Sequence, residues 1–150
     1  MMSVLLAFVL VIAMIPAAQA AYSWKLTDGT LVYSGDGVLP SSNSWKQFQF
    51  GRATGVEVKE GFTTIGSNAF SGMTNLLEVK LPQSVTEIQY SAFQGCSKLA
   101  SIELPDRLAA LGEYAFQGCS ALQAITIPEG VTSIEDGTFW ACNSLTSVII

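Results

Sequence analysis

The chain has 150 residues, no histidine and a net charge of −5 from 12 acidic and 7 basic residues. Without histidine it lacks the Ser-His and Cys-His pairs that activate nucleophiles, and its Lys and Arg residues are too scattered to bind nucleic acid. These features predict a single domain that is not an enzyme, needs no metal or cofactor and has no nucleic-acid partner.

Residues 1–20 are typical of a secretory signal peptide. An apolar run extends from Val4 to Ile15, and the small-residue pattern Ala18-Gln19-Ala20 follows it. This pattern predicts cleavage before Ala21 and no stable membrane insertion afterwards. No Lys or Arg precedes the run, so an uncleaved anchor is the alternative, although the run is shorter than the ~20 residues that a span needs.

Residues 21–52 are predicted to form an N-terminal capping region. In WKLTDGTLVY, Asp28-Gly29 is a two-residue turn between alternating segments, which predicts a β-hairpin. The turn pairs Thr27 with Thr30, Leu26 with Leu31, and Trp24 with Tyr33. The apolar residues fall on one face, which we expect to cover the first coil of the repeats. Residues 40–45 are predicted to be a loop.

Residues 53–150 repeat with a period of 23 residues, and the last repeat is incomplete. AFQGCS occurs twice, at Ala92 and at Ala115. Apolar columns keep the same spacing: Ile65, Ile88, Leu111 and Ile134; Phe70, Phe93, Phe116 and Phe139; Leu76, Leu99, Leu122 and Leu145; Val79, Ile102, Ile125 and Val148. Such a period is typical of a solenoid, in which each unit buries its apolar face against a copy of itself.

Each unit is predicted to combine a strand, a bend and a helical arc. In LASIELP, Ile102 and Leu104 alternate with polar residues, and Pro105 ends the strand because proline has no N–H to donate. In LGEYAFQGCSAL, the apolar residues fall at helix-like spacings, and Gly118 suits the end of a helical turn. We therefore predict an α/β solenoid of the leucine-rich-repeat or β-helix type, and the helical arc favours the former.

One column of the repeat contains Cys96, Cys119 and Cys142, with Met73 at the same place in the earlier coil. The absence of histidine and of a Cys-x-x-Cys pair disfavours a metal site, and a disulfide between coils would leave one cysteine over. A column that accepts Met or Cys indicates buried, unpaired thiols. The phenylalanines are expected to stack into a ladder through the same core.

The run CSKLASIELPDRLAALGEYAFQGCSALQAITIPEGVTSIEDGTF closely resembles the BspA-like leucine-rich repeats, whose units read Cys-x-x-Leu-x-x-Ile-x-Ile-Pro and then Ile-Gly-x-x-Ala-Phe. The leading WKLTDGTLVYSGDGVLPSSNSW is similar to the region that often precedes them, so the resemblance covers residues 22–150. Met73 and Thr138 depart from the motif. The resemblance implies a curved, right-handed coil with a parallel sheet on its concave face, in a secreted or cell-surface protein associated with adhesion and protein binding.

The candidate ligand-binding residues are the outward positions of the predicted strands. They form two rows: Glu78, Ser101, Ala124 and Ser147, and then Glu57, Lys80, Glu103, Thr126 and Ile149. Lys80 lies between Glu57 and Glu103, so these charges have the alternative role of pairing across strands. Trp140, at a place where Ser71 stands in an earlier coil, is a candidate aromatic anchor or a cover for the last coil.

These features predict a secreted or cell-surface module that binds a host or matrix protein, or a surface polysaccharide, through its concave face. The alternative is a structural, self-assembling scaffold without a specific ligand. No capping pattern follows SVII. Phe139, Leu145, Val148 and Ile150 are therefore expected to face solvent beside an unpaired strand edge, through which the chain could self-associate.

Overall fold

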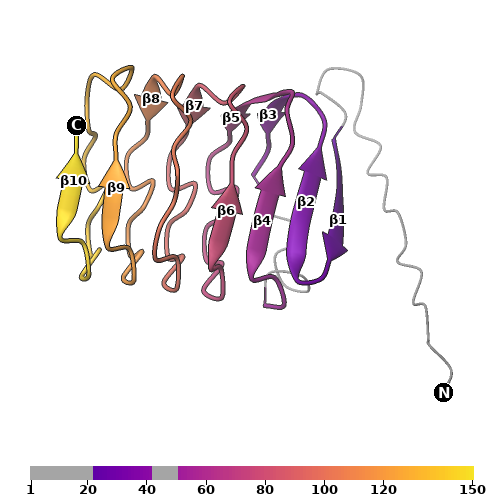
Figure 1. Cartoon of the computed structure of the whole chain (residues 1–150), viewed down its shortest axis with the longest axis horizontal. Coiled ribbons are helices and arrows are strands. Elements are labelled where there is room, and N and C mark those ends of the chain that lie inside the picture. The colour runs from indigo at the N-terminus through magenta and orange to yellow at the C-terminus, as the bar shows by residue number, and fades with distance from the viewer. Residues whose placement is uncertain (1–21, 42–50) are drawn as a thin grey trace, which may run out of the picture.

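The computed structural model describes residues 22–41 and 51–150 of the chain. Its strands are β1 (Ser23–Thr27), β2 (Thr30–Ser34), β3 (Gly37–Leu39), β4 (Gly55–Val58), β5 (Phe62–Ile65), β6 (Glu78–Lys80), β7 (Glu87–Ile88), β8 (Ala110–Leu111), β9 (Ala124–Thr126) and β10 (Ser147–Ile149). The coils stack in chain order from β1 at one end to β10 at the other (Figure 1). The predicted signal peptide and most of the predicted loop at residues 40–45 lie outside the described residues.

The strands form two sets that run along the stack. The front strands comprise the hydrogen-bonded sheet β1-β2-β4-β6 and the separate pair β9-β10, and the back sheet has the order β3-β5-β7-β8. Only β1 and β2 pair antiparallel among the described strands. Val56 pairs with Val79, and Ile88 pairs with Leu111, which are the partners that the sequence columns predict. The stacked parallel solenoid is therefore confirmed.

The predicted N-terminal hairpin is also confirmed. β1 and β2 pair in the register expected from the sequence. Asp28 and Gly29 have φ values of 48° and 80°, and a two-residue turn of type I′ requires positive φ at both positions. Leu31 and Tyr33 are buried, and β2 pairs with β4 of the first coil. The hairpin thus covers the N-terminal end of the stack, as predicted.

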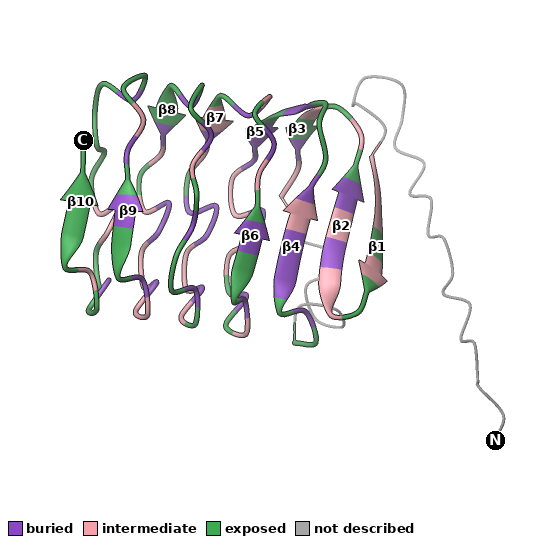
Figure 2. Cartoon of the chain, viewed as in Figure 1, coloured by how far each residue is buried: buried purple, intermediate pink, exposed green. Residues whose placement is uncertain are grey.

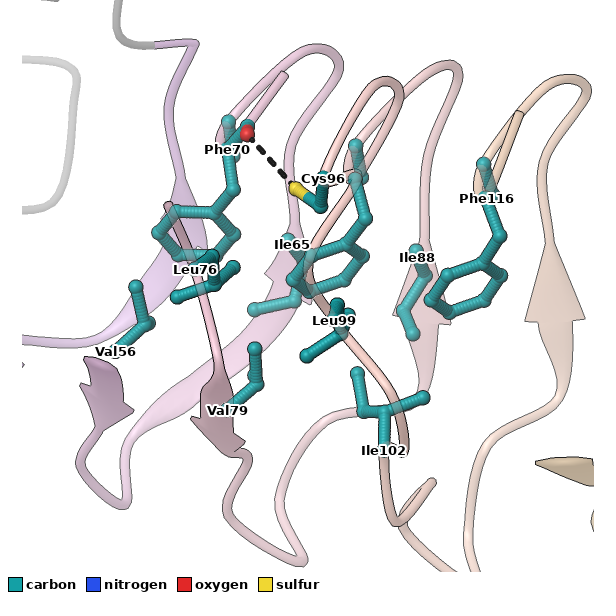
Figure 3. Close-up of a cluster of buried hydrophobic side chains, with 14 of the residues drawn as sticks. Val56, Ile65, Phe70, Leu76, Val79, Ile88, Cys96, Leu99, Ile102 and Phe116 are labelled. Atoms are coloured by element: carbon teal, nitrogen blue, oxygen red, sulfur yellow. Dashed lines mark hydrogen bonds between the residues drawn. The ribbon is translucent and has the colours of Figure 1, made fainter. Parts of the chain in front are cut away.

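Phenylalanine rings stack through the core from coil to coil. The ring centroids lie 5.3 Å apart for Phe70 and Phe93, 5.4 Å for Phe93 and Phe116, and 5.9 Å for Phe116 and Phe139. Tyr33 of the hairpin meets Phe70 edge-on at 5.6 Å, so it closes the N-terminal end of the ladder. Buried aliphatic side chains from both sets of strands surround the rings (Figure 3). The predicted aromatic ladder is confirmed.

The cysteine column lies in the same core. All three thiols are free and buried, and Met73 is buried at the equivalent place. Each Sγ–H donates to a phenylalanine carbonyl oxygen of the preceding coil: Cys96 to Phe70 at 3.4 Å, Cys119 to Phe93 at 3.2 Å and Cys142 to Phe116 at 3.1 Å (Figure 3 shows the first). The prediction of buried, unpaired thiols is confirmed. The cysteine recurs because it fills the equivalent core position in successive coils.

The predicted helical arcs are wrong, because none of the residues 22–41 and 51–150 is helical. Each arc twice takes a positive φ, a conformation that ends a right-handed helix. The first such positions in successive coils are Asn68, Ser91, Tyr114 and Gly137, and the second are Gly72, Gly95, Gly118 and Ala141. Alternate N–H groups of the arc also donate to the next coil, as Phe70 N does to the Ala92 carbonyl at 2.8 Å. The arcs are therefore series of turns, and the fold is an all-β solenoid.

The back sheet is a second departure from the prediction of one strand per coil. Its strands β7 and β8 are only 2 residues long, and β5 has 4 residues. Segments of this length are too short to display the alternation that marks a strand in sequence. Their apolar residues fit the start of a helical arc equally well.

The last coil is partly exposed, as expected. Ile150 is 89% exposed and Val148 43%, whereas Phe139 and Leu145 are half-buried against the core. β10 pairs with β9 alone among the described strands, and it is exposed along its whole length (Figure 2).

Candidate functional site

The outward side chains of the front strands form one continuous surface, which we call the front face. It consists of the predicted binding positions Glu57, Glu78, Lys80, Ser101, Glu103, Ala124, Thr126, Ser147 and Ile149. All are exposed except Glu57, which is half-buried. They alternate with the buried Val56, Val79, Ile102 and Ile125, so the period of two puts one row in the core and the other in solvent. The predicted outward orientation is confirmed, whereas the curvature of this face stays a prediction.

The charged residues of the front face pair differently from the prediction. Lys80 stands opposite Glu57 in register, but its Nζ forms an ion pair with Glu78 Oε1 at 3.1 Å, within its own strand. Glu57 Oε1 accepts from Lys59 Nζ at 2.5 Å. Residues two apart on a strand share a face, which makes both pairs possible. Glu103 forms no ion pair within the described part of the chain.

Glu57, next to the hairpin, is a front-face residue whose pKa is shifted by nearby charges. The hydrogen bond from Lys59 lowers the pKa of Glu57, and the charges of Lys59, Lys80 and Lys25 add to the effect. The side chains of Lys80 and Glu78 are 66% and 65% exposed, so their ion pair contributes little to stability. These charges therefore remain available to a ligand at little structural cost.

A groove of about 830 Å³ opens on the front face between β6 and β9. Its lining includes Glu78 and Lys80 from β6, Ser101 and Glu103 from the next coil, and Thr126 from β9. With Ala124 of β9, six of the predicted front-face positions thus meet in one concavity. A smaller hollow of about 260 Å³ beside the hairpin includes Glu57. Ser147 lies on β10, outside both hollows.

The hydrogen-bond ladder of the front strands is interrupted inside this groove. Residues 101–104 occupy the strand position between β6 and β9, yet they are not paired with either. Gln123 N donates to the Ala100 carbonyl at 3.1 Å, and the next paired front strands are β9 and β10. The interruption is local, because the back sheet pairs continuously from β3 to β8.

The groove also contains residues that the sequence did not single out. Leu77 is 55% exposed at its rim, in a column where the other coils have Ala100, Gln123 and Thr146. A leucine in a column of small and polar residues could have been recognised in the sequence as a candidate site residue. Gln83 and Asp106 form another edge, where Asp106 N donates to Gln83 Oε1 at 3.1 Å. Their position after the strand-ending prolines gave no indication of a site.

Trp140 lies apart from the groove. Its side chain is 67% exposed, at the place held by Gln94 and Gln117 in the preceding coils, and those two amides hydrogen-bond to each other. Gly118 N donates to the Trp140 carbonyl at 2.8 Å, so the residue belongs to the last turn arc. The structure therefore does not join Trp140 to the other predicted site residues.

A second groove, of about 510 Å³, lies over the back sheet. Glu87, Glu113 and Glu135 line it together with the exposed Tyr90. Glu87 accepts from Gln89 Nε2 at 3.1 Å, and Glu135 from Ser133 Oγ at 2.7 Å. Both bonds lie within one coil, whereas Glu87 also accepts from Thr64 Oγ1 of the preceding coil at 3.4 Å and so links two neighbouring strands. In residues 22–41 and 51–150 no cluster of His, Cys, Asp and Glu has the arrangement of a metal site, and no helix could cross a bilayer.

Solved structures similar to this chain are bacterial leucine-rich repeat proteins. One from T. pallidum is 30% identical with a TM-score of 0.65, covering 85% of this chain and 67% of its own. A leucine rich cell surface protein from Faecalibacterium prausnitzii A2-165 is 28% identical with a TM-score of 0.68, covering 89% and 43%. A leucine-rich repeat protein from Bacteroides ovatus is 30% identical with a TM-score of 0.66, covering 91% and 41%. The chain thus spans about two fifths of the latter two proteins.

No curated protein matches the chain. The family model described as the BspA type leucine rich repeat region matches residues 44–150 in 6 copies. The match includes every coil whose stacking, aromatic ladder and cysteine column are described above. The chain belongs to the BspA-type leucine-rich repeat family.

Proposed function

We propose that the chain is a secreted or cell-surface binding module that recognises a protein, such as a host or matrix protein, through its front face. The observation that carries the proposal is the groove between β6 and β9, in which six outward strand residues converge. Extended surfaces of stacked repeats are the usual binding sites of solenoid proteins. A surface polysaccharide is the other partner class that this face could accept.

Exchanging the charges of Lys80 and Glu103 tests the proposal. The double variant Lys80→Glu with Glu103→Lys keeps the net charge, but it reverses the charge pattern inside the groove. We expect capture of matrix proteins from an extracellular extract to weaken, while the cooperative melt stays intact because both side chains are exposed. The matched control is Lys98→Glu with Glu113→Lys, which makes the same exchange outside the groove.

Unchanged capture by the groove variant would move the site elsewhere on the molecule, with Trp140 as the next residue to test. Equal losses in both double variants would show a general charge effect and would contradict a site in the groove.

Export is the second part of the proposal. It rests on the apolar run and the Ala18-Gln19-Ala20 pattern, and it is supported by membership in a family with a cell-surface relative. Mass spectrometry of the exported chain should show Ala21 as the N-terminal residue. An intact Met1 in a membrane fraction would support the retained anchor instead.

A structural scaffold that self-assembles is the second candidate function. The observation in its favour is β10, whose backbone edge and side chains are exposed. Such an edge is a template for pairing with a strand of another chain. Fibres that form without any ligand would favour the scaffold over the binding module.

A further inference from the structure

We infer that the groove of about 510 Å³ over the back sheet binds an amino sugar of a polysaccharide, that is, a pyranose ring that carries a free ammonium group. The site lies on a different face from the groove between β6 and β9, so the inference goes beyond the proposed function. Three features of the back groove support it: an open floor between two walls, an aromatic ring in a fixed orientation, and carboxylates without a counter-ion in the lining.

The groove exists because small residues stand in the middle of three neighbouring coils. Ala110 pairs in register with Glu87 of β7, and Gly112 occupies the place that Gln89 holds in that coil. A Cβ at Gly112 would meet the carbonyl carbon of Gln89 at 2.7 Å, so this part of the floor cannot carry a side chain. Glu135 occupies the same place in the following coil and forms the opposite wall. Because neighbouring strands lie about 4.8 Å apart, the walls stand about 10 Å apart, which leaves room for one pyranose ring.

Tyr90 gives the groove an aromatic face whose orientation is fixed. Its side chain lines the groove and is 48% exposed. The ring meets that of Tyr114 edge-on, with the centroids 5.8 Å apart and an angle of 81° between the planes. Tyr114 in turn lies against Gly137 of the next coil, where a Cβ would clash with its ring. An exposed ring held in this way can pack against the apolar face of a sugar and attract a cation.

The polar groups of the groove leave mainly acceptors for a ligand. Ser67 Oγ donates to Gln89 Oε1 at 3.4 Å, and Gln89 Nε2 donates to Glu87 Oε1 at 3.1 Å. Ser133 Oγ donates to Glu135 Oε1 at 2.7 Å. These donors are occupied within the protein, whereas each carboxylate can accept further hydrogen bonds. Since the acceptors belong to different coils, a ring with hydroxyl and ammonium donors around its edge reaches more of them than a single point charge does.

The carboxylates select a cationic sugar. Glu87, Glu113 and Glu135 line the groove, and its lining contains no Lys or Arg. None of the three forms an ion pair with any described residue. A neutral sugar would leave these charges without a counter-ion, whereas an ammonium group forms charge-assisted hydrogen bonds with them. An acidic polysaccharide is repelled for the same reason.

Titration of the chain with a hexasaccharide of β-1,4-linked glucosamine, under conditions that keep its amines protonated, tests the inference. The amide signals of Ala110 and Gly112 should shift in ¹⁵N-correlated NMR spectra. The N-acetylated hexasaccharide keeps the rings but removes the charge, and hexalysine keeps the charge but has no ring. Each should bind about tenfold more weakly, because it lacks one of the two features that the groove recognises.

Variants of the chain separate the contribution of the ring from that of the charge. Tyr90→Leu should weaken binding of the glucosamine hexasaccharide about fivefold, whereas Tyr90→Phe keeps the ring and should retain the affinity. Glu135→Gln should weaken binding about fivefold, because it removes one carboxylate charge. Glu129→Gln makes the same change at an exposed position outside the groove and should leave the affinity unchanged.

Equal affinity for hexalysine and the glucosamine hexasaccharide would overturn the inference in favour of a basic polypeptide. Equal affinity for the N-acetylated hexasaccharide, or shifts confined to the front face, would overturn it as well.

The proposed function has a separate readout. The exchange of Lys80 and Glu103 should leave sugar binding unchanged, whereas Lys98→Glu with Glu113→Lys should weaken sugar binding and leave capture of matrix proteins intact. Matrix-protein capture that depends on Lys80 and Glu103, without any binding of the sugar, would support the front-face module and reject the sugar site.

Discussion

Phe93 has an aromatic neighbour on each side, since its ring stacks at 5.3 Å on Phe70 and at 5.4 Å on Phe116. Its side chain is fully buried. Phe93→Ala removes this rung and leaves a cavity that two rigidly stacked coils cannot close. We expect the free energy of unfolding to fall by about 3–5 kcal/mol, measured by chemical denaturation.

The matched control for this prediction is Tyr90→Ala, which truncates an exposed ring in the same coil. Its loss should be clearly smaller. Equal losses for the two variants would contradict a special contribution of the buried ladder.

The thiols give a second prediction at the scale of single residues. Burial raises the pKa of Cys96 from 9.0 to about 12, and it also raises the pKa values of Cys119 and Cys142. Because the thiolate is the reactive form, Cys96 and Cys119 should resist alkylation in the folded chain and react after denaturation. Rapid labelling of either thiol in the native protein would refute this account.

The same shift predicts a dependence of stability on pH. The unfolded thiol ionises near pH 9.0, whereas the folded Cys96 stays protonated up to about pH 12. The contribution of the Cys96 thiol to the free energy of unfolding is therefore full below pH 9 and decreases as the pH rises toward 12. Cys96→Ala should flatten this decrease in denaturation curves recorded from pH 8 to 11, whatever its effect on stability at pH 8.

At the scale of the element, each turn arc depends on two residues with positive φ. The second of these is glycine in three coils, but Ala141 takes a φ of 59° in the last. Left-handed backbone is unfavourable for alanine and free of steric cost for glycine. Since Ala141 is exposed, Ala141→Gly loses no packing, and we expect it to stabilise the chain by about 0.5–1 kcal/mol in thermal or chemical melts.

The converse substitution, Gly95→Ala, checks the explanation. A Cβ at Gly95 meets nothing closer than Gly72 backbone atoms at 3.8 Å, so any loss comes from the φ of 73° and not from a clash. We expect a destabilisation of about 1–2 kcal/mol. A neutral result for both substitutions would show that the arcs relax away from the left-handed conformation.

In the described part of the chain, the hairpin covers one end of the stack and β10 forms the other. Ile149 is 56% exposed on β10, beside Val148 and Ile150. We expect a polypeptide of residues 21–150 to self-associate through this edge, so that its mass in light scattering rises with concentration. Ile149→Lys should reduce the effect, because charged residues on an edge strand oppose pairing.

Thr126→Lys is the matched control, since it adds the same charge in the same row on β9. A chain that stays monomeric at every concentration, or an equal response to both lysines, would exclude association through β10.

The sequence alone determined the features that depend on repetition and on short-range geometry. The 23-residue period requires equivalent residues to stack, so the spacing of the columns around Phe93 and Cys119 is enough to identify them as core. The outward row through Lys80 and Thr126 followed from the period of two, and Asp28-Gly29 specified the hairpin because few residue pairs accept its positive φ values.

Only the tertiary structure decided where the backbone N–H and C=O groups of each coil find their hydrogen-bond partners. The apolar spacings of the arcs fit a helix, but alternate N–H groups of the arcs bond to the neighbouring coil, and such long-range bonds leave no local pattern in the sequence. The same holds for the short strands of the back sheet and for the partner of Lys80, which is Glu78 on its own strand. The break in the front ladder at residues 101–104, and hence the groove, depends on how three coils meet. The sequence of a single repeat does not determine how the three coils pack.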